Sequence, residues 1–210
     1  MAYFHQNWYA SFYGTEPTER FRIIIGFTNG GGNYGPSRQL PGQPIEAFAI
    51  CGYSVDEKTG KAFENGLDFA ATLIHEFNHS FVNRLLDDET NKNMLEPLGK
   101  KLLKHSYRAM NSQAYRNAQT VINESIVRAA VILYMKDNGF AVEQIKEEMD
   151  EQISRGFDWM PELVATLHDY SSQYNKYKTL NAYYPQIAKV LKRYIDKEDK
   201  RVGKVLWRKF

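Results

Sequence analysis

Residues 65–86 have the sequence NGLDFAATLIHEFNHSFVNRLL, and their apolar side chains recur at the spacing of an amphipathic helix. Asn65 is a candidate N-cap, Asp68 favours the positive end of the helix dipole, and Asp87 opens a polar connection after the helix. The apolar stripe of this helix consists of Ile74, Phe77, Phe81 and Leu85. Its polar face consists of Asp68, Thr72, His75, His79 and Asn83. We therefore expect a helix that presents two histidines on a face separate from the one that it packs.

The two histidines, His75 and His79, stand four positions apart in the motif His-Glu-Phe-Asn-His. At about 3.6 residues per turn, both imidazoles lie on one side of the helix and can reach the same tetrahedral ion, as zinc ligands do. Glu76 lies about 100° around the helix, too far to bind the ion in the same way but within reach of a water beside it. A pair of histidines filling a core is the alternative, and the polar character of their face argues against it. The sequence thus predicts zinc ligands at His75 and His79 and a general base at Glu76.

A catalytic zinc usually has three protein ligands, so a third is expected outside this motif. Glu124 is the best candidate because residues 120–134 are apolar enough to form a buried helix, where a divalent cation would neutralise its charge. The alternative is an ion pair with Arg128, four positions further on, on a partly exposed helix face. Arg128 is otherwise expected to support the ligand or to bind a substrate carboxylate. If Glu124 is not the ligand, the next candidates are Asp87, Asp88 and His168.

Strand patterns precede the helical ones. Residues 20–27 and 45–53 are short apolar runs of strand length, separated by a glycine-rich turn or loop. The period then becomes helical, with candidate helices at 65–86, 95–107, 118–137, 142–153, 161–171 and 184–195. Strands followed by helices form an α+β pattern. Without a linker or a repeat, we expect one domain over residues 1–210, strand-rich over 1–60 and helical over 65–210.

The composition excludes several functions. Lys and Arg number 27 against 25 Asp and Glu, which leaves a net charge of +2 and gives no electrostatic reason to expect nucleic acid or an anionic membrane surface. No apolar run reaches the roughly 18 residues that a bilayer span requires. Cys51 is the single cysteine, so no disulfide can form within the chain, and its apolar strand favours a core position.

The motif of residues 75–79, followed downstream by Glu124 in Asn-Glu-Ser, resembles the gluzincin metallopeptidases, in which a glutamate on a second helix completes the site. This resemblance implies a zincin-like fold, with an N-terminal twisted β-sheet, a metal-binding active-site helix and a mostly helical C-terminal half. It also implies one Zn²⁺ per chain on the three ligands above. Arg128 departs from thermolysin-like members, which carry there an aspartate that orients a zinc histidine. That orienting role is left to Asp68, Asn83 or a backbone carbonyl.

A second resemblance covers most of the chain. Residues 23–36, 75–83 and 177–185 are similar to a family of uncharacterised bacterial proteins described as secreted metallopeptidases. Its members usually carry a signal peptide and further N-terminal sequence. The resemblance implies a secreted or periplasmic protein, with a longer form that extends upstream of the aromatic-rich stretch 3–9.

These features predict a zinc-dependent peptidase that acts on a peptide or protein substrate. Zinc supplies an acidified water and polarises the scissile carbonyl, and Glu76 takes a proton from the attacking water for the leaving amine. Tyr177, one of several tyrosines in 170–184, is the candidate donor to the developing oxyanion. The strand before the metal helix is expected to be an edge strand, as in zincins, with Phe48 and Ala49 binding an extended substrate. The alternatives are a catalytically inactive zinc-containing binding module and a metal-dependent hydrolase of a non-peptide amide.

Overall fold

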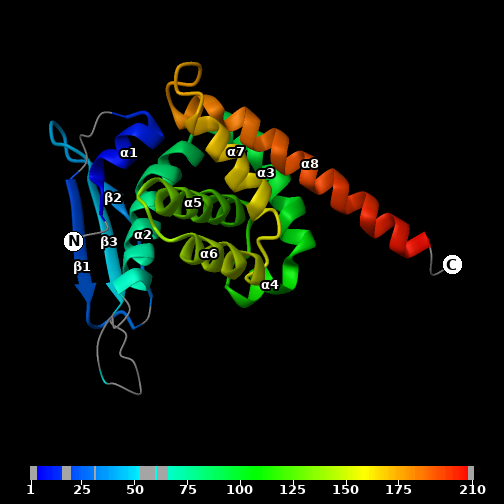
Figure 1. Ribbon diagram of the computed structural model, residues 1–210, viewed down its shortest axis with the longest axis horizontal. Helices are drawn as coiled ribbons and strands as arrows, with labels where there is room; N and C mark the ends of the chain where they lie inside the picture. Colours follow the sequence, from blue (N-terminus) through cyan, green and yellow to red (C-terminus); the bar gives the residue numbers. More distant parts are fainter. Residues whose placement is uncertain (1–3, 16–19, 31, 53–59, 61–65, 208–210) are drawn as a thin grey trace. The chain divides into compact units, whose positions relative to one another are not determined.

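A small sheet is formed by β1 (Arg20–Gly26), β2 (Ser37–Arg38) and β3 (Glu46–Gly52). The strand order is β1-β3-β2, so β3 is the central strand (Figure 1). β1 runs parallel to β3, with Arg20 opposite Glu46, and β2 runs antiparallel to it. The two long strands lie within the predicted runs 20–27 and 45–53, and their crossover contains the short third strand.

The computed structural model describes residues 4–15, 20–30, 32–52, 60 and 66–207, without the side chains of 66–68 and 202–207. The predicted cap Asn65 and the side chain of Asp68 lie outside these residues. The chain divides into two compact units, Met1–Arg84 and Leu85–Phe210. The sheet belongs to the first unit, and the second is helical. The architecture is therefore α+β, as predicted, while the single domain and the zincin-like details stay predictions.

The two faces of the sheet carry different kinds of side chain. On one face, Phe21 of β1 packs its ring edge-on against Phe77 of helix α2 (Gly66–Leu86), with ring centroids 5.0 Å apart. On the other, Glu46 accepts hydrogen bonds from Arg22 Nε at 2.5 Å and from Arg38 Nε at 2.6 Å. These two guanidinium groups come from the outer strands, and one central carboxylate thus connects all three strands.

Residues 6–13 form helix α1 (Gln6–Tyr13), although they lie in the region predicted to be strand-rich. Aromatic residues occur there at the spacing of one helix face, namely Trp8, Tyr9, Phe12 and Tyr13. Three of them, Tyr9, Phe12 and Tyr13, are buried. The predicted strands at 20–27 and 45–53 lie after this helix, for which no element was predicted.

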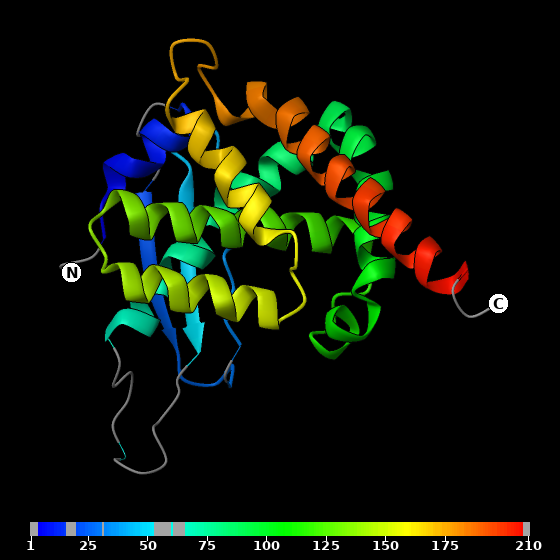
Figure 2. The ribbon, with the colours of Figure 1, turned by 45° about the vertical axis from the view of Figure 1, so that its right-hand side comes forward.

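The second unit contains α3 (Glu89–His105), α4 (Tyr107–Ser112), α5 (Ala118–Asp137), α6 (Val142–Ser154), α7 (Met160–Ser171) and α8 (Leu180–Trp207). Helix α5 is its centre: it contacts α3, α6 and α7, while α8 contacts α3 and α7 (Figure 2). The side chains from Val121 to Met135 are almost all buried, which agrees with the apolar all-round sequence of α5. The indole of Trp159 donates to Ser125 Oγ at 2.9 Å inside this core.

The predicted helices agree with the observed ones except at their ends. α3 begins before the predicted 95–107 because the Asp88 side chain caps it, accepting from the backbone N–H groups of Thr90 and Asn91. It continues through Pro97, which is exposed. α8 likewise extends beyond the predicted 184–195 at both ends. Among the described residues, no helix combines the length and the apolar character that a membrane span requires.

Candidate metal centre

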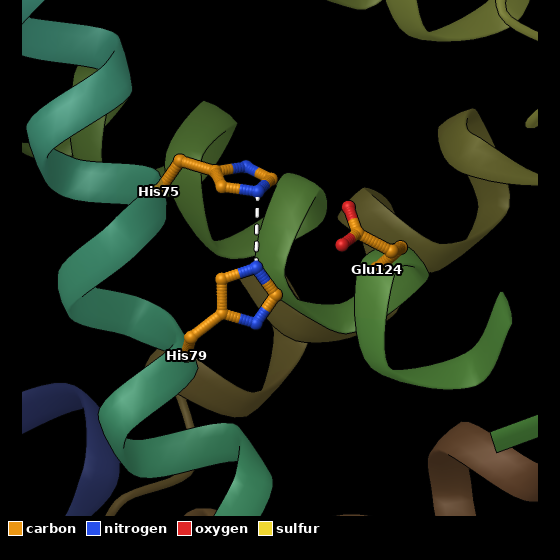
Figure 3. Close-up of side chains that lie close together, drawn as sticks. All are labelled: His75, His79 and Glu124. Atoms are coloured by element: carbon orange, nitrogen blue, oxygen red, sulfur yellow. Dashed lines mark hydrogen bonds between the residues drawn. The ribbon is translucent and has the colours of Figure 1, made fainter. Parts of the chain in front are cut away.

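The first part of the site lies on α2, where His75 and His79 come one turn apart. Their Nε2 atoms are 3.1 Å from each other and the ring planes are inclined by 77°, so both imidazoles point to one place (Figure 3). Two nitrogens bound to one tetrahedral zinc at about 2.0–2.1 Å stand about 3.4 Å apart. The observed separation therefore suits two ligands of one ion. Both histidines are half-buried.

Aromatic packing holds the buried side of α2. The Phe81 ring stacks on Tyr13 of α1 at a centroid distance of 4.4 Å. The Tyr13 hydroxyl donates to Asn78 Oδ1 at 2.9 Å, so a polar residue inside the histidine motif has a buried partner. The predicted apolar stripe is confirmed at Ile74, Phe77 and Phe81, which are buried. The motif thus stands on a helix whose rotation is fixed from the opposite side.

A close chain crossing fixes α2 from a second direction. Gly35 lies so near the helix that an added Cβ would stand 1.9 Å from the carbonyl oxygen of Glu76 and 2.8 Å from the Cβ of His79. The Ser80 hydroxyl donates to the carbonyl oxygen of Pro36 at 3.2 Å. A glycine is required at this crossing because any side chain would displace the turn of α2 that carries the motif.

Glu76 is buried, with an exposed fraction of only 5%, whereas His75 and His79 are half-buried. Burial raises the pKa of the Cys51 thiol to about 11, and the charge of Glu76 adds to this rise. Cys51 is thus a buried thiol, as predicted, and the Glu76 carboxyl lies in largely dry surroundings.

The second part of the site lies on α5, where Glu124 is buried together with Arg128. Arg128 donates to Glu124 Oε2 through Nε at 3.1 Å, and its Nη2 lies 3.0 Å from the same oxygen. Nη1 donates to Gln152 Oε1 at 2.7 Å and Nη2 to the Tyr115 hydroxyl at 2.9 Å. The predicted pair of Glu124 and Arg128 exists, but on a buried face and not on the partly exposed one that we expected.

The candidate ligands come from both units. His75 and His79 lie in Met1–Arg84 and Glu124 lies in Leu85–Phe210, and Figure 3 draws the three side chains. Two imidazole nitrogens and one carboxylate oxygen are a donor set that catalytic zinc accepts, with a fourth position left for water. The alternative ligands have other surroundings. Asp88 caps α3, Asp87 is exposed, and His168 Nε2 lies 2.8 Å from Lys136 Nζ.

The predicted edge position of the strand that carries Phe48 and Ala49 is wrong. The strand of Phe48 and Ala49 is central and not an edge, because the segment 34–38 pairs with its free side. The Phe48 N–H donates to the Pro36 carbonyl at 3.0 Å, and Ile50 is likewise bonded to Tyr34, so the strand cannot accept a substrate there.

Arg128 was also predicted to bind a substrate carboxylate, and this role stays a prediction. Its side chain is 7% exposed, and its donors are engaged by three protein side chains. Tyr177 lies in the connection from α7 to α8, where its ring packs edge-on against Tyr183. Its role as oxyanion donor stays a prediction. Asn83, a candidate to orient a histidine, is exposed.

Sequence reasoning missed Tyr115 and Gln152. They lie 13 and 24 positions from Arg128, and neither has a spacing that would link it to Glu124. Burial raises the pKa of Tyr115, and the negative charge of Glu124 is the second cause. The only available signal was the buried Arg128 itself, because a buried guanidinium needs several acceptors.

The fold and the site define an α+β protein with two helix-borne histidines and one buried glutamate as candidate metal ligands. The chain belongs to the family described as Domain of unknown function (DUF4932), whose model matches residues 3–190. This match includes both helices that carry the candidate ligands. Searches of curated proteins and of solved structures found no match.

Proposed function

We propose that this protein is a zinc-dependent peptidase in which His75, His79 and Glu124 hold one Zn²⁺ per chain. The observation that carries the proposal is the approach of the two Nε2 atoms to 3.1 Å, with a buried carboxylate next to one histidine in the sequence. A structural zinc site needs no such carboxylate. A zinc ion bound there would supply an acidified water and a Lewis acid for the scissile carbonyl.

Glu76 is the general base of this proposal. Its carboxylate takes a proton from the attacking water and delivers it to the leaving amine. The low exposure of Glu76 strengthens its electrostatic interaction with a nearby cation or proton. The neighbouring Phe77 and Ile74 are buried, so the backbone that carries Glu76 has little freedom to move away.

The substrate would bind as an extended peptide at the outer edge of segment 34–38. This segment forms the sheet edge in place of the predicted strand, and all its residues except Gly35 are exposed. Its inner side is bonded to β3 through Tyr34 and Pro36, and Gly35 rests on the turn of α2 that carries Glu76. A peptide that adds a strand to this edge would run beside the metal helix.

Zinc content and peptide cleavage test the proposal together. Wild-type protein purified without chelator should contain one zinc per chain, His79→Ala should contain far less, and Glu124→Gln should lose well over tenfold in zinc affinity. Equal zinc in wild type and His79→Ala would refute the metal site.

The cleavage assay uses a broad mixture of unfolded proteins with zinc near neutral pH. Glu76→Gln should keep zinc and lose roughly 10²–10⁴ of the hydrolysis rate, since a positioned base contributes that much. Glu89→Gln, an exposed carboxylate at the start of α3, is the matched control and should keep full activity. Bound zinc without any chelator-sensitive fragments would instead favour a binding module or a hydrolase of another amide.

A further inference from the structure

The contacts of Arg128 differ from those of an ordinary helix ion pair. Pairs at i and i+4 are usually exposed and contribute little to stability. Such a pair occurs at the C-terminal end of α6, where Arg155, the residue after the helix, and Glu151 are 44% and 49% exposed. In the pair of Arg128 and Glu124 the side chains are 7% and 11% exposed. A buried pair of this kind persists only when its remaining hydrogen-bonding groups are satisfied.

Groups outside α5 satisfy those remaining donors. The Gln152 amide oxygen comes from α6 and the Tyr115 hydroxyl from the connection before α5. The Phe157 ring lies 5.0 Å from the guanidinium carbon, within the range of a cation–π contact. Gln152 is itself held, because its Nε2 donates to Glu148 Oε1 at 2.6 Å. The position of the guanidinium is therefore fixed by side chains from α6 and from the connections before α5 and after α6.

Both contacts of Arg128 with Glu124 go to one oxygen, Oε2. A carboxylate that binds a metal with both oxygens would have to share Oε2 between the ion and the guanidinium. A carboxylate that binds through Oε1 keeps its pair with Arg128 intact. The fixed guanidinium thus favours metal binding by Glu124 through Oε1 over metal binding through both carboxylate oxygens.

We propose that Arg128, held by Tyr115 and Gln152, is a positioning residue that presents Glu124 to the metal through Oε1 alone. This inference rests on the proposed zinc site. In thermolysin-like enzymes an aspartate stands at the position of Arg128, and it orients a zinc histidine. In this protein the residue at that position is a cation, and it would orient the glutamate. Arg128 touches neither substrate nor reacting atoms in this scheme.

The test measures zinc affinity by competition with a chromophoric chelator, and zinc coordination by X-ray absorption. Arg128→Lys keeps the positive charge and removes the planar fork. It should weaken zinc binding by about 10–100-fold, as loss of an outer ligand contact usually does. Its absorption spectrum should show two carboxylate oxygens on zinc, where the wild type shows one.

Tyr115→Phe and Gln152→Met each remove one support of Arg128 and leave the buried charges paired. Tyr115→Phe also removes the hydrogen bond between its hydroxyl and Glu124, so Gln152→Met is the variant that acts on Arg128 without touching Glu124. Both should weaken zinc binding in the same direction, by up to about tenfold. Arg155→Lys, in the exposed pair with Glu151, is the matched control and should bind zinc as the wild type does. If Arg128→Lys fails to fold, these milder variants decide.

The outcomes separate this inference from the proposed function. A wild type that binds no zinc refutes both. A wild type that binds zinc, with unchanged affinity and one carboxylate oxygen in all three variants, refutes the positioning role alone. A purely structural role would lower the free energy of unfolding without altering the zinc coordination.

Discussion

Helices α2 and α5 both place polar residues in buried surroundings, but by different means. The candidate ligands on α2 are imidazoles on a half-buried face, and the contacts that support their helix are mostly aromatic. The candidate ligand on α5 is a buried carboxylate that is paired with Arg128. A neutral ligand therefore needs only a rigid backbone, whereas a buried anion also needs a cation and acceptors for that cation.

This difference predicts that the two ligand types affect metal-free stability unequally. Glu124→Leu leaves the buried Arg128 without its anion and should lower the free energy of unfolding by about 3–5 kcal/mol. His79→Gln, on the half-buried face, should change it by only about 0.5–1 kcal/mol. Denaturant unfolding of metal-free protein, followed by circular dichroism, measures both.

A double variant tests whether the loss of stability comes from the unpaired charge of Arg128. Glu124→Leu combined with Arg128→Met removes both charges and should recover most of the lost stability, since apolar replacements of a buried ion pair are often neutral. Equal stability of Glu124→Leu and the wild type would mean that the buried pair has no effect on folding. Helices α2 and α5 would then differ in their residues but not in how much their candidate ligands affect stability.

Close crossings at glycine provide a second comparison, one in each unit. An added Cβ would meet backbone at 1.9 Å from Gly35 and at 2.6 Å from Gly99, where the obstacle is the Ala118 carbonyl. At Gly32 it would meet only the tip of the Tyr34 side chain, at 2.8 Å. None of these three glycines has a positive φ, so the steric effect is isolated.

We expect the stability losses to follow that order. Gly35→Ala and Gly99→Ala should each lose about 1–3 kcal/mol or more through overpacking, with Gly35→Ala the larger, whereas Gly32→Ala should lose little because Tyr34 can turn away. Gly35→Ala should also weaken zinc binding, since the turn of α2 that carries the ligands must move. A Gly35→Ala protein with wild-type unfolding and wild-type zinc affinity would contradict the crossing.

Local patterns were enough to predict some of these features. The helix around His75 follows from its apolar period, and the burial of α5 together with Glu124 follows from the apolar sequence of residues 120–134. The central position of β3 in the sheet could not be predicted from the sequence, because its second partner is a two-residue strand inside a glycine-rich loop. The role of Tyr115 did not follow either, because its contact with Arg128 depends on how the chain folds back before α5.

Two other carboxylates, Glu46 and Glu148, have pKa values shifted in opposite directions, so their effects on stability change with pH in opposite ways. Hydrogen bonds from Arg38 and Arg22 lower the pKa of Glu46. Its stabilising effect is therefore present above the unfolded pKa of about 4.5 and is lost as the pH falls through the folded value. Burial raises the pKa of Glu148, and the bond from Gln152 offsets this only in part. Its effect is present below about 4.5 and is lost as the pH rises through the folded value.

Glutamine replacements isolate these two effects, which should be the smallest considered. Relative to wild type, Glu46→Gln should be destabilised at neutral pH and should lose this difference in acid, where the wild-type carboxyl is protonated too. Glu148→Gln should show the opposite trend, with a relative gain in stability as the pH rises, because the amide has no charge to bury. Unfolding free energies measured from acid to neutral pH give both curves. Parallel curves for wild type and Glu148→Gln would mean that burial does not disfavour its charge, and the far end of the Arg128 network would then be hydrated.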